Sequence, residues 1–158
     1  MNFYMKQKVF SWNDRFYIYD GLGNERYYVE GEMFSFGKKL HLFDTEGNEL
    51  AFISQKLFSF APKYYVHRAG LPTVEVIKRF TFFKDEYFVD GLGWNAFGDF
   101  FDHEYEIFNG NFSIAAVSKE WFSFGDAYRI SISDDVDAIA ALSVILIIDA
   151  CNEAEDRF

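Results

Sequence analysis

The chain has a single cysteine, Cys151, among its 158 residues. A lone cysteine cannot form an intramolecular disulfide, which points to a reducing compartment. The first six residues also lack the apolar run of a secretory signal peptide. These two absences predict a cytoplasmic protein.

Basic charge is also scarce, with 15 Lys and Arg residues against 25 Asp and Glu residues and a formal net charge of −10. On average, this net negative charge repels the phosphates of nucleic acids and of anionic lipid surfaces. We therefore expect no nucleic-acid partner. A local basic patch could still attract an anionic partner, because salt screens exposed charges beyond about 8 to 10 Å.

Motifs of known enzyme classes are missing as well. The chain has no Gly-x-Ser-x-Gly, no P-loop and no dinucleotide-binding glycine loop; Gly21-Leu22-Gly23 and Gly91-Leu92-Gly93 are typical of turns. His41, His67 and His103 are too widely spaced for a short zinc-binding motif. We expect no catalytic activity, no cofactor and no metal, unless distant strands assemble a site.

Apolar residues, by contrast, are abundant: 50% of the chain is hydrophobic and 22% is aromatic, with 21 Phe. A chain of this length fits one domain, here 1–158, which buries about 68 to 70% of its unfolded surface. Up to residue 132, short runs of Phe, Tyr, Val and Ile alternate with Gly- and Asn-containing turns, a pattern typical of an antiparallel meander. The predicted strands are 3–9, 15–20, 25–31, 39–44, 49–55, 63–68, 73–79, 86–90, 104–109, 112–119 and 126–132.

Two sequence matches indicate two similar halves. Tyr28-Val29-Glu30-Gly31 is followed 60 positions later by Phe88-Val89-Asp90-Gly91, and Phe58-Ser59-Phe60 is followed 64 positions later by Phe122-Ser123-Phe124. Matches in the same order and at similar spacing are typical of an internal duplication. An aromatic-rich chain also produces Phe-Ser-Phe by chance, as Phe34-Ser35-Phe36 shows, so both interpretations stay open.

After residue 132 the pattern changes to an apolar helix, predicted over 135–153, with Asp134 and Asp137 as a capping pair. Ser143 is the only polar residue in 138–148, so this segment has no face to give to solvent. Eleven helical residues cover about 16 Å, too short for a hydrocarbon core of about 30 Å. The sequence therefore predicts a mainly β fold, a closed antiparallel barrel whose lumen the helix fills through Ile139, Leu142, Ile145 and Leu146.

Several segments resemble the LURP-one-related family of the tubby C-terminal-like superfamily, which also includes the phospholipid scramblases. The residues that carry the resemblance are 4–10, 16–20, 28–31, 47–53, and Tyr128-Arg129-Ile130 leading into the acidic turn and the apolar helix. The resemblance spans essentially the whole chain and implies a barrel of about twelve strands around a central hydrophobic helix. The resemblance rests on aromatic, glycine and hydrophobic patterns rather than on catalytic signatures, so it predicts the fold better than it predicts the activity.

Lipid binding, which the resemblance implies for tubby-like relatives, needs basic residues. Lys78 and Arg79 are the candidate headgroup contacts, and Arg would bind phosphate as a bidentate fork and Lys as a point charge. Further candidates are Lys38, Lys39, Lys56, Lys63 and Arg68, although the basic residues are scattered along an acidic chain and solvated strand ends explain them as well.

Carboxylates also cluster at two places. Asp102, Glu104 and Glu106 would share one face of a strand, near Asp99 and His103, and could hold calcium or magnesium through oxygen ligands, but their spacing matches no calcium loop. Asp134, Asp135 and Asp137 invite a second calcium interpretation, but helix capping accounts for the same residues without an ion and is the interpretation we favour.

Two functions from different classes follow. The leading hypothesis is a non-catalytic interaction or scaffold domain of the LURP-one-related type, which binds a protein partner through the outer wall or rims of a filled barrel. The alternative is a peripheral protein that binds a membrane phospholipid, such as a phosphoinositide, or moves lipids as the resemblance to scramblases implies.

Overall fold

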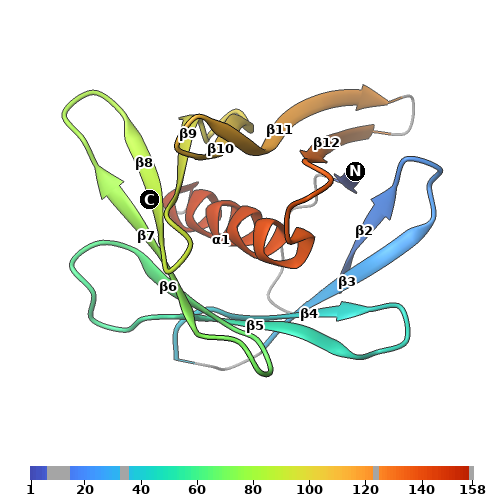
Figure 1. Cartoon of the computed structure of the whole chain (residues 1–158), viewed down its shortest axis with the longest axis horizontal. Helices are drawn as coiled ribbons and strands as arrows, with labels where there is room; N and C mark the ends of the chain where they lie inside the picture. The colour runs from blue at the N-terminus through green and yellow to red at the C-terminus, as the bar shows by residue number, and fades with distance from the viewer. Residues whose placement is uncertain (7–14, 33–35, 123–124, 157–158) are drawn as a thin grey trace.

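The computed structural model describes residues 1–6, 15–32, 36–122 and 125–156, in which twelve strands precede one helix (Figure 1). The elements are β1 (Asn2–Lys6), β2 (Phe16–Asp20), β3 (Glu25–Gly31), β4 (Lys39–Asp44), β5 (Glu49–Gln55), β6 (Lys63–His67), β7 (Val74–Phe80), β8 (Asp85–Asp90), β9 (Trp94–Asp99), β10 (Glu104–Asn109), β11 (Phe112–Phe122), β12 (Gly125–Ile132) and α1 (Ala138–Asp156). Residues 7–9 of the predicted strand 3–9 lie outside the described residues.

Each strand pairs antiparallel with its neighbour in sequence, and β1 pairs with β12 to close the barrel. Phe3 is in register with Ile130 across that closing pair, and both side chains are buried. The predicted closed antiparallel barrel is confirmed. Each described strand therefore has a hydrogen-bonded neighbour on both sides, and a closed barrel of this kind has no open sheet edge to protect.

β9 is the one strand that the sequence prediction missed. Its residues include Asn95, Gly98 and Asp99, which are depleted in strands and typical of turns. Trp94 and Ala96 nevertheless point inward and are buried, and Asn95 faces outward. A Cβ at Gly98 would lie 2.6 Å from the backbone oxygen of Glu104, so this position needs glycine for the β9–β10 pairing.

α1 passes through the middle of the barrel with strands on all sides of it (Figure 1). Leu142, Ile145 and Leu146 are buried, and Ile139 is partly buried at the start of the helix. The one polar residue in this stretch, Ser143, donates its hydroxyl proton to the carbonyl of Ile139 at 2.7 Å, so nothing polar is left unsatisfied there. The prediction of a central hydrophobic helix is confirmed.

The start of α1 corrects the predicted capping pair. Asp137 alone is the N-cap, accepting a hydrogen bond from the Ala140 amide at 3.2 Å. Asp134 instead binds the N-terminal ammonium group of Met1 at 3.0 Å, which ties the first strand to the segment before the helix. Within the described ranges, no helix combines the length and the apolar character that crossing a membrane requires.

The two ends of the barrel differ in character. Because strand directions alternate, every second connection lies at the same end. At the end where α1 begins, the connections are short turns at 21–24, 45–48, 68–73 and 91–93; we call this the acidic end. At the end where α1 finishes, residues 32–38, 56–62 and 81–84 join β3 to β4, β5 to β6 and β7 to β8; we call this the loop end.

The strand topology fits only the second of the two sequence matches that predicted a duplication. Residues 28–31 lie on β3 and residues 88–90 on β8, five strands later, so the two segments run in opposite directions through the barrel. A barrel made of two equal halves would place them six strands apart. The second match, 58–60 with 122–124, joins β5 to β6 and β11 to β12, although Ser123 and Phe124 lie outside the described residues. The duplication stays a prediction.

Candidate functional site

Lys78 and Arg79, the headgroup candidates, point to opposite sides of β7. Lys78 is 2% exposed, and its ammonium group binds the carboxylate of Glu155 on α1 and lies 3.5 Å from that of Asp85. Arg79 is on the outer wall, 4.0 Å from the Glu86 carboxylate. The two residues therefore do not form one basic site.

The inward direction of Lys78 follows from the alternation of β7. Val74 and Val76 are on the inner face of the strand, and position 78 continues that series. Lys38 is equally enclosed, at 5% exposed, and its ammonium group lies 2.6 Å from the carboxylate of Glu153. Two buried lysines thus hold the last turns of α1 at the loop end, since an ammonium group in such surroundings needs an anionic partner.

Cys151 lies on the same part of α1, beside the hydroxyl group of Tyr87. Burial raises the pKa of the thiol to about 11, against a smaller opposing effect of the Tyr87 contact and of Lys78. At neutral pH the thiol is protonated, and a protonated buried thiol is a poor nucleophile. An apolar groove of about 430 Å³ opens nearby, lined by Gln55, Pro62, Tyr64, Phe80, Cys151, Ala154 and Glu155.

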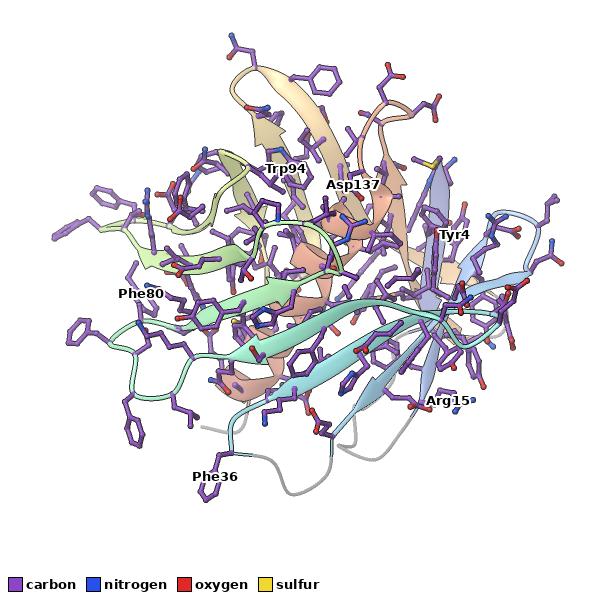
Figure 2. All side chains as sticks on the ribbon, turned by 60° about the horizontal axis from the view of Figure 1, so that its bottom comes forward. Tyr4, Arg15, Phe36, Phe80, Trp94 and Asp137 are labelled. Carbon is purple, nitrogen blue, oxygen red and sulfur yellow. The ribbon has the colours of Figure 1, made fainter. Side chains whose placement is uncertain are left out.

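The feature that sets the loop end apart is a group of exposed phenylalanines on three neighbouring loops and at the end of β7. Figure 2 shows Phe36 and Phe80 projecting away from the barrel. Phe58 and Phe60 are fully exposed, and Phe82 is 96% exposed. We call this group the phenylalanine rim; its members are Phe36, Phe58, Phe60, Phe80, Phe82 and Phe83.

Phe58 adds an observation on backbone conformation. It has a φ of 58°, in the left-handed region that non-glycine residues rarely adopt. Its side chain buries no surface that would offset this cost. Stability therefore does not explain a phenylalanine at this position.

The same three loops and the strand ends beside them are rich in positive charge. Seven basic residues stand there against Glu32, Asp85 and Glu86, and two of the seven, Lys38 and Lys78, are paired with Glu153 and Glu155 at the end of α1. The seven are Lys38, Lys39, Lys56, Lys63, Lys78, Arg79 and Lys84. Lys56 and Lys84 are exposed and make no ion pair with any described residue. At the acidic end the balance is reversed, because the turns carry Asp20, Glu25, Asp44, Glu46, Glu49, Asp90, Asp134, Asp135 and Asp137 against Arg26 and Arg68.

The acidic cluster on β10 is arranged differently from the prediction. Asp102 lies in the turn before the strand, with its backbone amide bonded to the Asp99 carboxylate at 3.0 Å, so Asp102 does not share a strand face with Glu104 and Glu106. Glu104 accepts a hydrogen bond from the Lys119 amide. In the described part of the chain, no group of three or more His, Cys, Asp or Glu side chains is placed to hold a metal ion.

The three histidines lie apart and take part in separate contacts. His41 is on the outer wall between Glu49, at 2.5 Å, and Glu32, at 3.1 Å. Partial burial alone would lower its pKa, but the two carboxylates outweigh that effect and raise the pKa above 6.5. His103 stacks on Tyr128 and lies 3.7 Å from Asp149. Burial raises the pKa of Asp149 to about 6, while Lys38 opposes that rise.

An aromatic row crosses the outer wall from β2 to β6. Stacked or tilted ring pairs connect Tyr17, Tyr28, Phe43, His41, Phe52, His67 and Tyr65. Because these rings pack against one another along the outer wall, their faces already contact neighbouring rings, and such ring pairs stabilise a sheet. The row is better explained by strand pairing than by ligand stacking.

The fold and the site together define a class of protein: a closed antiparallel barrel filled by its own helix, with a loop-borne apolar surface at one end. The family model described as LURP-one-related matches residues 1–149. The chain is also 36% identical over 146 residues to the uncharacterized protein YxjI of Bacillus subtilis (strain 168), a match that covers 92% of this chain and 90% of that protein. The chain belongs to the LURP-one-related family.

A solved structure supports the fold assignment. The X-ray structure of an Arabidopsis thaliana protein is similar with a TM-score of 0.66, covering 96% of this chain and 90% of that chain. The sequences are only 18% identical, so this likeness concerns the fold alone. Sequence reasoning reached the family but missed the phenylalanine rim, because exposed and buried phenylalanines look the same in an aromatic-rich chain.

Proposed function

We propose that this protein is a non-catalytic interaction domain that binds its partner through the phenylalanine rim. One observation carries the proposal: six phenylalanines, five on three adjacent loops and Phe80 at the end of β7, together expose apolar surface on the order of 1,000 Å² at one end of the barrel. Single exposed apolar side chains are normal on a protein surface, whereas several large ones gathered at one end are typical of an interaction surface.

The filled lumen supports the same proposal, because it leaves no space for a ligand in the middle of the barrel. Barrels of the lipocalin type hold a ligand in the lumen, and here Leu142, Ile145 and Leu146 occupy that space. The protonated state of Cys151 gives no reason to expect nucleophilic catalysis. Binding at the rim is the role that remains best supported.

The phospholipid alternative gains no support in the form that the sequence suggested. Its proposed contacts, Lys78 and Arg79, face opposite sides of β7, and the ammonium group of Lys78 is already engaged by carboxylates. A lipid contact would have to be made by other residues of the loop end.

Site-specific photo-crosslinking in cells tests the proposal. p-Benzoylphenylalanine replaces Phe58 or Phe82 on the rim, and in matched controls it replaces Phe97 or Phe112, which are about half exposed elsewhere on the barrel. We expect crosslinks to a partner, protein or lipid, from positions 58 and 82 only. Equal crosslinking from all four positions, or none from the rim, would refute the proposal.

A further inference from the structure

We propose that a pocket at the acidic end of the barrel binds a small zwitterion, a free apolar amino acid about the size of leucine. The pocket lies between the first turns of α1 and the strands β6 and β7, with Asp137 in its lining. Figure 2 shows Asp137 at the start of α1, away from Phe36 and Phe80. The pocket is therefore separate from the phenylalanine rim, and it binds its ligand independently of the partner of the rim.

The floor of the pocket is apolar and belongs to the core. Ala140 and Val144 are four residues apart on α1 and share one face of the helix. Val66 on β6 and Val74 on β7 line the pocket with them, and Leu92 joins them from the turn between β8 and β9. Such a surface favours the apolar side chain of a ligand, because burial there removes apolar area from water.

The size of the pocket restricts the ligand to a small molecule. Its volume is about 200 Å³. An apolar cavity of about 150 Å³ binds benzene, whereas pockets for drug-sized ligands are about 300 to 1,000 Å³. The pocket therefore suits one branched or aromatic side chain and is too small for a nucleotide or for a lipid with its acyl chains.

The mouth of the pocket holds one charge of each sign. Nη1 of Arg68, in the turn between β6 and β7, donates to Oδ2 of Asp137, and the two side chains are 21% and 46% exposed. A guanidinium group has five N–H donors, and no other hydrogen bond joins the Arg68 side chain to a described residue. Oδ1 of Asp137 accepts the Ala140 amide, which leaves lone pairs on both carboxylate oxygens. Both charged groups can therefore accept a further partner from solvent.

This ion pair matches a zwitterion better than it matches a single ion. The ligand's carboxylate would bind the open edge of the Arg68 guanidinium group, and its ammonium group would bind Asp137, while its side chain enters the pocket. A carboxylate without the ammonium group would gain Arg68 but would face Asp137. It would also be repelled by the neighbouring carboxylates of the acidic end, Asp90, Asp134 and Asp135. An amine without the carboxylate would gain Asp137 but would face the like charge of Arg68.

Isothermal titration calorimetry of the full chain tests the inference with four probes: L-leucine, leucinamide, 4-methylpentanoate and L-alanine. Leucinamide lacks the carboxylate, 4-methylpentanoate lacks the ammonium group, and alanine lacks most of the side chain. We expect saturable binding of leucine and roughly tenfold or weaker binding of each other probe, because each loses one charged contact or most of the apolar burial. Equal binding of leucine and either singly charged analogue, or no saturable binding of leucine, would overturn the inference.

Substitutions at the mouth separate the roles of the two charges. R68Q should abolish the preference for leucine over leucinamide. D137N, in which asparagine still caps the helix, should abolish the preference for leucine over 4-methylpentanoate. The matched controls R26Q and D135N each remove a charge of the same sign at the same end but outside the pocket lining, and they should bind leucine like wild type. Equal losses in the controls would contradict a specific site.

Ala140→Leu fills the pocket without changing its charged groups. Ala140 is 8% exposed and lines the floor, so the larger side chain would occupy the space of the ligand. Leucine binding should be lost while the melting temperature, followed by circular dichroism, does not fall. Ala154→Leu, at the other end of α1, is the control and should bind leucine like wild type. A folded Ala140→Leu protein with unchanged affinity for leucine would place the ligand elsewhere and refute the inference.

Discussion

At the scale of single residues, the loop end contains an apolar side chain exposed to water and charged groups that are buried. Phe58 exposes its ring and holds a left-handed backbone, and Lys38 and Lys78 place ammonium groups inside a barrel. Asp149 is a carboxylate on the buried helix, with a pKa raised to about 6 by that burial. Each of these groups costs stability or needs a partner, and together they distinguish this end from the rest of the barrel.

Asp149 makes stability depend on pH in a definite direction. The folded protein keeps the carboxyl proton up to about pH 6, whereas the unfolded chain loses it near pH 4, so the free energy of unfolding falls as pH rises between those values. Asp149→Asn removes this effect and should stabilise the protein by about 2 kcal/mol at pH 7, after allowance for partial exposure. Near pH 3 the two proteins should be equally stable.

Urea titrations of both proteins at several pH values measure this difference. Asp134→Asn is the matched control, because Asp134 is exposed and lies at the other end of the barrel. A pH-independent difference between wild type and Asp149→Asn would show that the carboxylate is not destabilised by burial.

At the scale of elements, α1 decides what the barrel can hold. Its central residues contact strands on all sides, and its last turns are held by Lys38 and Lys78 from the β3–β4 loop and β7. The helix is therefore both the core of the fold and the anchor of the loop end. A disturbance of the helix should affect stability far more than a disturbance of any single loop.

Ile145→Asp tests the position of the helix. Ile145 is 2% exposed, so the new carboxylate would be buried without a partner and should reduce the free energy of unfolding by several kcal/mol. Ala154→Asp, on the exposed final turn of the same helix, should cost less than about 1 kcal/mol. Thermal denaturation followed by circular dichroism compares the two, and native stability of Ile145→Asp would refute a central helix.

At the scale of the whole molecule, the helix and the barrel should fold together. The helix has no polar face for water, and a barrel without it would enclose an empty apolar space. β1, which is only five residues long, closes the barrel by pairing with β12 and β2. No part of this arrangement has a core of its own.

Unfolding should therefore be a single cooperative transition. Urea denaturation followed by far-ultraviolet circular dichroism, which reports helix and strands, should coincide with denaturation followed by tryptophan fluorescence. Trp94, on β9, is a buried reporter of the barrel wall. Two separated transitions would mean that the helix or part of the barrel folds independently.

The amino-acid sequence by itself determined the strand positions, the barrel and the central helix, because these depend on local alternation and on the apolar content of one short segment. Val74 and Val76 alternate with Glu75 and Ile77, and 138–148 has only Ser143 as a polar residue. β9 was not predicted, because Asn95, Gly98 and Asp99 are locally typical of turns and only pairing with β8 and β10 makes that segment a strand.

Tertiary structure alone decided where the proposed binding surface lies. Chain position could not show that Lys78 points to Glu155, 77 residues away, whereas Arg79 faces out. Nor could it show that phenylalanines near residues 36, 58 and 82 gather at one end, because that depends on the alternating strand directions of a closed barrel. Burial and charge around a side chain are set by residues distant in sequence, and these distant residues divide the phenylalanines into core and rim.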